Sequence, residues 1–165
     1  MIGSHEWNVD NICKIGKYLI DTEETIAVAE SVTAGLLQSA FSQGESAMQY
    51  FQGGITTYTL EQKSRHLYVN YQEAQECNGV SGSIAKQMAM GVCNLFKSNW
   101  GIGITGFATP VPESGFNLFA FFSIVHNKKE LFTHKVILNN GITTIEGQSL
   151  YVSTIIDIMA SAYTK

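Results

Sequence analysis

One short stretch, residues 25–35, constrains the fold of this chain more than any other. Its four apolar residues 26–29 are typical of a strand covered on both faces, and residues 35–41 have the composition and spacing of a helix. The polar residues between the two are Glu30, Ser31 and Thr33. The pattern predicts a buried strand that turns directly into a helix, which is a building unit of α/β folds.

The turn at Ser31 is a candidate for chemistry. The first N–H groups of a helix lack intrahelical partners and carry partial positive charge, so they stabilise a negative group placed above them. A serine held at such a turn can attack a carbonyl group while nearby N–H groups receive the oxyanion that develops. Ser and Thr also cap helices very commonly, and on this stretch alone we expect Ser31 or Thr33 to be a simple N-cap.

The composition excludes several classes of protein. With 165 residues, 45% hydrophobic and 15% charged, the chain is expected to form one globular domain over residues 1–165. A formal charge of −4 and a single arginine, Arg65, argue against a nucleic-acid partner. The low charge fraction indicates that another copy covers some apolar surface, so we expect a homo-oligomer.

Cysteine and histidine spacing gives no sign of a metal site. The three cysteines are far apart and the four histidines follow no metal-binding pattern, so no metal or other cofactor is expected. Such cysteines are typical of a reduced, cytoplasmic protein. The first residues lack the pattern of a signal peptide, and no segment has the length of a membrane span. We therefore expect a cytoplasmic protein with no membrane partner.

Helical and strand periodicities alternate along the rest of the chain. The expected helices cover residues 8–20, 84–96 and about 144–162, with a short polar helix after the N-cap Thr59. The expected strands cover residues 50–58 and 101–106, and a hairpin has arms at 118–125 and 131–138. Residues 70–79 are expected to be a surface loop. This order predicts a three-layer α/β/α sandwich with a mixed central β-sheet.

Two of these strands carry further candidate residues. Gly53 lies beside Gly54, where missing side chains let a ligand or another backbone approach closely, and a simple β-bulge is the alternative. Thr105 and Gly106 end the strand 101–106 in a second turn of hydroxyl and glycine. For Thr105 a turn cap and a substrate contact both stay open.

Several separated segments match a known family in order and spacing. They are residues 29–35, 44–46, 51–58 with Lys63, 79–81 with the start of the following helix, and 104–106. Together they resemble the C-terminal domain of the competence/damage-inducible protein CinA. The resemblance covers nearly the whole chain, and it implies a layered α/β fold and a homo-oligomer.

The resemblance also implies an activity. Active members of this family hydrolyse the carboxamide of nicotinamide mononucleotide to nicotinic acid mononucleotide and ammonia, in pyridine-nucleotide salvage. The family's serine falls on Ser31, the tyrosine and lysine of its Y-x-x-x-x-K motif fall on Tyr58 and Lys63, and its later threonine falls on Thr105. The residues expected to contact a small-molecule substrate are Glu30, Thr33, Gly35, Gly53, Thr105 and Gly106.

The residue types are chemically coherent with that activity. A serine is a weak nucleophile unless a base removes its proton, and a lysine is the plausible base here. Lys63 must then be neutral part of the time, so burial or a nearby positive charge must lower its pKa from about 10.4. Tyr58 would orient the lysine or donate to the substrate, and an ordinary strand aromatic is its alternative reading.

Two departures from the family pattern leave three functions open. Residues 106–118 lack the family's glycine-rich loop and lysine, and residues 139–148 contain none of its arginines. The chain is therefore a nicotinamide mononucleotide amidase, a Ser-Lys amidohydrolase with a less anionic substrate, or a non-catalytic binding or assembly module. The distance from the Lys63 amine to the Ser31 hydroxyl discriminates, because about 2.6–3.2 Å keeps catalysis open.

Overall fold

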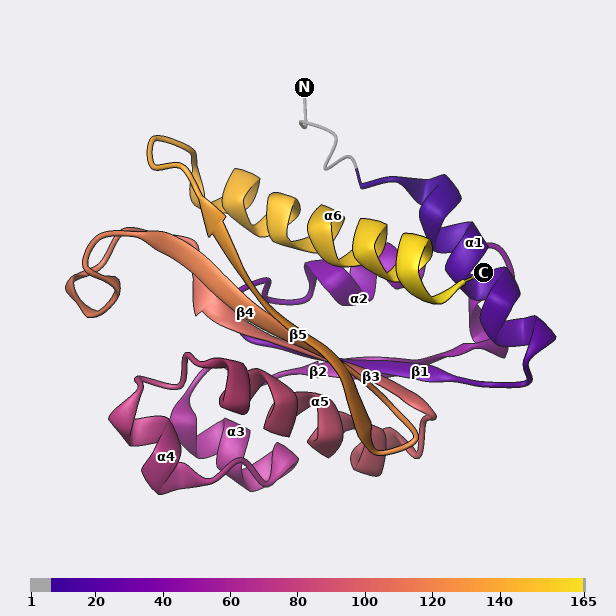
Figure 1. Ribbon diagram of the computed structural model, residues 1–165, viewed down its shortest axis with the longest axis horizontal. Helices are drawn as coiled ribbons and strands as arrows, with labels where there is room; N and C mark the ends of the chain where they lie inside the picture. The colour runs from indigo at the N-terminus through magenta and orange to yellow at the C-terminus, as the bar shows by residue number, and fades with distance from the viewer. Residues whose placement is uncertain (1–6, 165) are drawn as a thin grey trace.

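A five-stranded mixed sheet lies at the centre of the computed structural model, which describes residues 7–164 (Figure 1). The strands are β1 (Ile26–Glu30), β2 (Phe51–Thr56), β3 (Trp100–Phe107), β4 (Leu118–His126) and β5 (Lys129–Leu138). Their order across the sheet is β2-β1-β3-β4-β5. Strand β1 is parallel to both β2 and β3, whereas β4 and β5 continue the sheet as an antiparallel hairpin.

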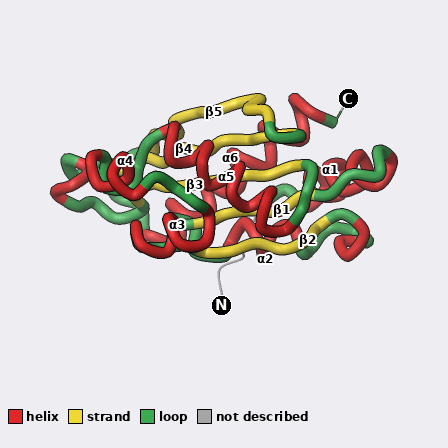
Figure 2. The backbone as a smooth tube through the Cα atoms, turned by 90° about the horizontal axis from the view of Figure 1, so that it is seen from below, coloured by secondary structure: helices red, strands yellow, loops and turns green. Residues whose placement is uncertain are grey.

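Helices cover both faces of the sheet, so the predicted three-layer α/β/α sandwich is confirmed. One layer holds α1 (Val9–Asp21), α2 (Leu36–Phe41) and α6 (Thr144–Tyr163), and the other holds α3 (Leu60–Leu67), α4 (Tyr71–Glu76) and α5 (Gly82–Phe96). Short 3₁₀ turns lie at Ala47–Gln49 and Pro112–Ser114. The view in Figure 2 shows the second helical layer lying across the strands. No helix among residues 7–164 is both long and apolar enough to span a membrane.

Strand β3 divides the core between the two helical layers. On one face, Ile102 and Ile104 are wholly buried in the cluster shared with α1 and α6. On the other face, glycines let α5 approach the strand closely. A Cβ atom added to Gly103 would lie 2.2 Å from the carbonyl oxygen of Ala85 in α5. The alternation of large side chains and glycine therefore sets the distance between sheet and helix.

The helix caps follow the sequence signals in most places. Thr59 caps α3 as predicted. Thr143 caps α6, where it forms a full capping box with Glu146, and Ser81 caps α5. The expected loop at 70–79 is wrong, because α4 forms there with Asn70 as its N-cap. This six-residue helix buries only Ala74 of its own residues, so it has no apolar period to detect.

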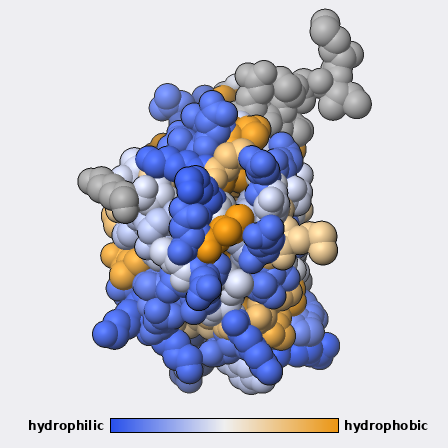
Figure 3. All heavy atoms as spheres, turned by 90° about the vertical axis from the view of Figure 1, so that its right-hand side faces the viewer, coloured by the Kyte–Doolittle hydropathy of each residue, from blue (hydrophilic) through white to orange (hydrophobic). Residues whose placement is uncertain are grey.

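The candidate site lies where the carboxyl ends of three strands meet. Strands β1, β2 and β3 are parallel, so their carboxyl ends share one edge of the sheet, at the left of Figure 1. In open α/β sheets this edge is where ligands bind, because the loops that follow the strands converge there. Figure 3 shows the end of the molecule at the right of Figure 1, where hydrophilic side chains surround small hydrophobic patches.

Candidate active site

The turn after β1 is held by the buried carboxylate of Glu30. Its two oxygens accept hydrogen bonds from the N–H groups of Gly35 at 3.1 Å, Leu37 at 3.0 Å and Gln38 at 2.8 Å, and from the Thr33 hydroxyl. Glu30 therefore caps α2 internally. The expectation that the first N–H groups of this helix receive an oxyanion is wrong, because Glu30 already occupies them.

Ser31 is not the cap of α2. The N-cap position belongs to Gly35, whose φ of +102° suits glycine, and the Ser31 hydroxyl instead contacts Lys63. The Ser31 N–H donates to the carbonyl of Ile104 at 3.1 Å, which extends the pairing between β1 and β3 into the turn. Only 7% of Ser31 is exposed. The nucleophile candidate is thus held by the sheet itself and lies at the end of a buried strand.

Lys63 reaches Ser31 from the first turns of α3. Its Nζ lies 2.9 Å from Ser31 Oγ. This distance is within the range of about 2.6–3.2 Å that a general base needs. The same nitrogen lies 3.0 Å from the carbonyl oxygen of Thr57 and 3.5 Å from that of Tyr58. Within residues 7–164 no carboxylate forms an ion pair with Lys63.

Burial fixes the protonation chemistry of this lysine. Only 3% of Lys63 is exposed, and burial lowers its pKa from 10.5 to about 8. The charged ammonium has three N–H donors, which match Ser31 Oγ and the two carbonyl oxygens. After it loses one proton, the amine keeps two donors for the carbonyl oxygens and gains a lone pair that can accept the hydroxyl hydrogen of Ser31. Because the pKa of Lys63 is about 8, the neutral form that can act as a base is accessible at mildly alkaline pH.

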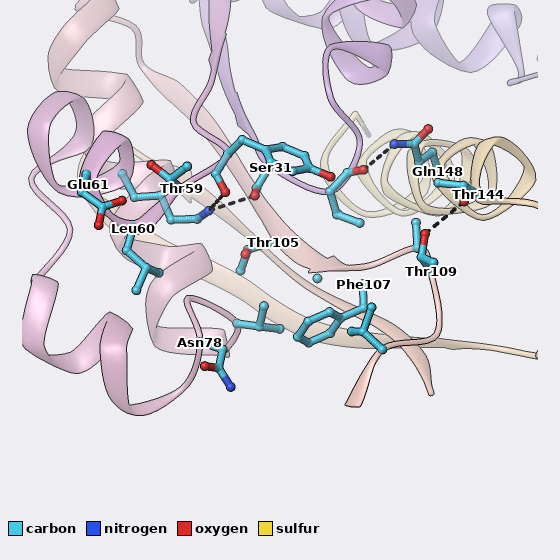
Figure 4. Close-up of a pocket in the computed structure, with 17 residues that line it drawn as sticks. Ser31, Thr59, Leu60, Glu61, Asn78, Thr105, Phe107, Thr109, Thr144 and Gln148 are labelled. Atoms are coloured by element: carbon cyan, nitrogen blue, oxygen red, sulfur yellow. Dashed lines mark hydrogen bonds between the residues drawn. The ribbon is translucent and has the colours of Figure 1, made fainter. Parts of the chain in front are cut away.

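A pocket of about 490 Å³ opens beside the serine and lysine (Figure 4). Thr105 and Gly106 of β3 line it together with Tyr58, so three of the predicted residues meet there with Ser31 and Lys63. The remaining walls come from the turn after Ser31, the start of α3, residues 78–80, the loop after β3 and the first turns of α6. The pocket thus gathers segments that lie far apart in the sequence.

The predicted substrate contacts divide into two groups. The pocket is lined by Thr105, although its hydroxyl donates to the carbonyl of Gly79 at 2.7 Å and so also holds the loop before α5. The predicted residues outside the pocket lining are Glu30, Thr33, Gly35 and Gly53. The first two are wholly buried in the turn, and Gly53 faces the ring of Phe96. A substrate would reach Glu30 and Thr33 only if the turn moved.

Tyr58 lines the pocket mainly through an exposed ring. The residue is 69% exposed. The Tyr58 atom that lies near the Lys63 amine is the main-chain carbonyl oxygen. Orientation of the lysine therefore falls to backbone oxygens of residues 57–58 and not to the phenol.

Several lining residues were missed by the sequence analysis. The Gln148 side chain donates to the Val32 carbonyl at 2.8 Å, and the hydroxyls of Thr109 and Thr144 lie 3.0 Å apart (Figure 4). These two bonds fasten α6 to the turn after Ser31 and to the loop after β3. Thr144 and Gln148 are four residues apart on one helix, so the sequence could predict that they share a face. It could not predict which segments that face contacts.

Comparison with known proteins decides the family. The model of the CinA C-terminal domain matches residues 10–153. The chain belongs to the CinA C-terminal domain family. A CinA-like protein of Trichodesmium erythraeum is 43% identical over 96 residues, which are 58% of this chain and 23% of that protein. A putative competence-damage inducible protein of Streptococcus agalactiae serotype III is 43% identical over 93 residues, 56% of this chain and 22% of that protein.

The length and fold comparisons place limits on what carries over. This CinA-family chain spans less than a quarter of the length of those curated relatives. The crystal structure of competence damage-inducible protein A from Klebsiella pneumoniae superposes with a TM-score of 0.88 at 18% identity, covering 95% of this chain and 97% of that one. A CinA superfamily protein from Enterobacter cloacae gives 0.87 at 21% identity, with 98% and 95% covered. Both likenesses concern the fold.

No cluster in the described chain is suited to a resident metal. Among residues 7–164, no group of three or more His, Cys, Asp or Glu side chains is placed to hold an ion.

Proposed function

We propose that this CinA-family chain is a serine amidohydrolase in which Ser31 is the nucleophile and Lys63 the general base. The observation that carries the proposal is the contact of 2.9 Å between Lys63 Nζ and Ser31 Oγ, with both residues buried beside an open pocket. A purely structural lysine in this position would lower the stability of the fold, because burial disfavours its charged form. A base that must be neutral near pH 8 gains from the same burial.

The first half of the reaction forms an acyl-enzyme. Lys63 Nζ takes the hydroxyl proton of Ser31 while Oγ bonds to the carbonyl carbon of the substrate amide, which gives a tetrahedral oxyanion. The oxyanion collapses, the C–N bond breaks, and Lys63 gives its proton to the departing nitrogen. Ammonia leaves, and the acyl group stays on Ser31 as an ester.

The oxyanion needs donors other than the N-terminus of α2. The N–H group of Val32 directly follows the nucleophile, and Val32 lines the pocket. This N–H donates no hydrogen bond within the described chain. A donor held in place by the fold stabilises a developing oxyanion without reorganisation at the moment of reaction. We assign Val32 that role.

The second half of the reaction releases the acid. A water molecule loses a proton to Lys63 and its oxygen attacks the ester carbonyl. Collapse of the second tetrahedral intermediate breaks the bond to Ser31 Oγ, which recovers its proton from Lys63. The products over the full cycle are a carboxylic acid and ammonia, and the enzyme is regenerated.

The substrate that the family likeness favours is nicotinamide mononucleotide. A pocket of about 490 Å³ lies within the usual range for small ligands, roughly 300–1,000 Å³. One observation favours the second candidate, an amide with less negative charge. Among the residues that line the pocket, Lys63 and Glu61 are the charged ones, and Glu61 would repel a phosphate.

Ammonia release from nicotinamide mononucleotide tests the proposal. The wild type is expected to release ammonia, Ser31→Ala to lose at least about 10³-fold in kcat, and Ser39→Ala to behave as wild type. Ser39 is the matched control because its side chain is exposed on α2. Release that survives in Ser31→Ala would contradict the nucleophile assignment.

Acyl labelling separates the remaining alternatives. A wild type that is acylated on Ser31 by an activated ester, yet leaves nicotinamide mononucleotide intact, would be an amidohydrolase with another substrate. A wild type that shows neither reaction would be a non-catalytic binding or assembly module, and the proposal would be wrong.

A further inference from the structure

An aromatic row begins at the pocket and leads away from it across the sheet. Phe107, at the end of β3, lines the pocket, and its ring packs edge-to-face against Phe119 with centroids 5.4 Å apart. Phe119 packs edge-to-face against Phe121 at 6.0 Å. All three side chains are partly exposed. The row therefore forms a continuous surface that extends one wall of the pocket.

Lys135 of β5 lies over this aromatic row. Its amine is 4.1 Å from the centroid of the Phe119 ring and 5.5 Å from that of Phe121. The two distances that join Phe107 to Phe119 and Phe119 to Lys135 place the amine within roughly 10 Å of the Phe107 ring. A cation over aromatic faces is held in place by the ring quadrupoles.

The strand register confirms that Lys135 shares the face of the pocket. Thr105 pairs with Phe121 across β3 and β4, and Phe121 pairs with Lys135 across β4 and β5. Residues paired in this way project from the same face of a sheet, and neighbouring strands are about 4.8 Å apart. Lys135 thus stands two strands away from Thr105, which lines the pocket beside Ser31.

The Lys135 amine is a cation without a carboxylate partner. Within residues 7–164 it forms no ion pair, whereas Lys86 on the neighbouring helix is paired with Glu130 at 2.7 Å. The residue is exposed, so an anion arriving from solvent can reach it. Lys135 also supplies a cation near a pocket that has none free to bind an anion. In the pocket Lys63 contacts Ser31, and Glu61 is negative.

We propose that Lys135 and the Phe107–Phe119 rings form an outer subsite that binds the anionic end of an amide substrate whose carbonyl lies at Ser31. The substrate class is then an elongated amide with a phosphate or carboxylate at least about 10 Å from the reacting carbon, because two strand spacings separate β1, which leads to Ser31, from β4, whose Phe119 lies under the amine. A flat or apolar middle section would lie against the Phe107 ring. The inference rests on the proposed function for the position of the amide, and it assigns the specificity for the far end.

A pair of substrates with the same amide tests the inference. Nicotinamide mononucleotide carries a phosphate, and nicotinamide riboside lacks it. We expect Lys135→Gln to raise KM for the mononucleotide about tenfold, to change kcat by less than about twofold, and to leave KM for the riboside unchanged. Lys135→Arg should restore most of the loss. Lys129→Gln is the matched control, because it removes an exposed lysine from the other end of the same strand.

The results distinguish this inference from the proposed function. Hydrolysis of both amides with unchanged KM in Lys135→Gln would overturn the subsite and leave the amidase intact. If the wild type hydrolyses neither amide, calorimetric binding decides: weaker binding of the mononucleotide alone in Lys135→Gln supports the subsite without the reaction. Equal weakening for both ligands, or no binding by the wild type, would overturn the inference. Competition by inorganic phosphate but not by acetate would identify the anion as a phosphate, and the reverse a carboxylate.

Discussion

Replacing Lys63 by methionine is expected to change how the stability of the protein depends on pH. Lys63 is 3% exposed, and burial lowers its pKa from 10.5 to about 8. The unfolded chain therefore keeps this proton up to about pH 10.5, whereas the folded chain releases it near pH 8. Between those values the unfolded state binds more protons, so the free energy of unfolding of the wild type rises with pH.

The size of the effect follows from the two pKa values. A lowering from 10.5 to about 8 corresponds to about 3 kcal/mol of destabilisation while the lysine is charged in both states. The cost is fully present below about pH 8 and disappears by about pH 10.5. Over the practical range from pH 7 to pH 9 the wild type should gain about 1 kcal/mol relative to Lys63→Met.

Urea unfolding at pH 7, 8 and 9 measures this difference. Loss of the hydrogen bonds to Ser31 and Thr57 shifts the stability of Lys63→Met by a constant, so the pH-dependent part of the difference isolates the ionisation. Tyr50, whose pKa burial raises to about 12, contributes equally to both proteins. Stability curves that run parallel for the two proteins would refute the depressed pKa, and with it the neutral base.

Three further outcomes test the frame around the site. Gly103→Ala should lower the free energy of unfolding, measured in urea, by about 2–3 kcal/mol, because the new methyl group would lie 2.2 Å from the Ala85 carbonyl oxygen. A stability within about 0.5 kcal/mol of wild type would mean that α5 does not pack so closely on β3. Glu30→Gln should cost about 2–3 kcal/mol by the same assay and weaken acylation of the serine, because three main-chain N–H groups and a hydroxyl donate to that carboxylate; an unaffected turn would contradict its capping role. Burial raises the pKa of Glu24, but its hydrogen bond with His126 at 2.8 Å helps to hold the pKa below the ordinary 4.5, so the stabilisation is present above pH 4.5 and is lost on acidification. The stability gap between wild type and Glu24→Gln should therefore close in acid, and a gap that widens would reverse the sign of the shift.

Local signals in the sequence carried most of the fold. Caps at Thr59 and Thr143, the apolar run after Thr25 and the alternating hairpin arms at 118–138 each depend on neighbours within one element, so each is visible in the chain. The helix α4 depends on contacts with other elements, which its own residues do not predict. The N–H of its N-cap Asn70 donates to the Gln87 side chain of α5 at 2.8 Å. Such tertiary support has no sequence period.

The candidate site divides in the same way. The motif likeness pointed to Ser31 and Lys63, and the structure places them in contact. The role of Glu30 was not predicted, because a carboxylate that closes its own turn and one that meets a ligand look alike in sequence. The outer row from Phe107 to Lys135 depends on register across three strands, and no single segment contains it.

The pH dependence of Ser31 acylation tests the central claim most directly. The protein would be treated with an activated acyl ester at pH 6 to 10, and the label on Ser31 counted by mass spectrometry. We expect the rate in the wild type to rise with pH through about 8, in step with deprotonation of Lys63, and the rise to vanish in Lys63→Met. A Ser31 that is labelled at the same rate in both proteins, or not labelled at all, would contradict the account.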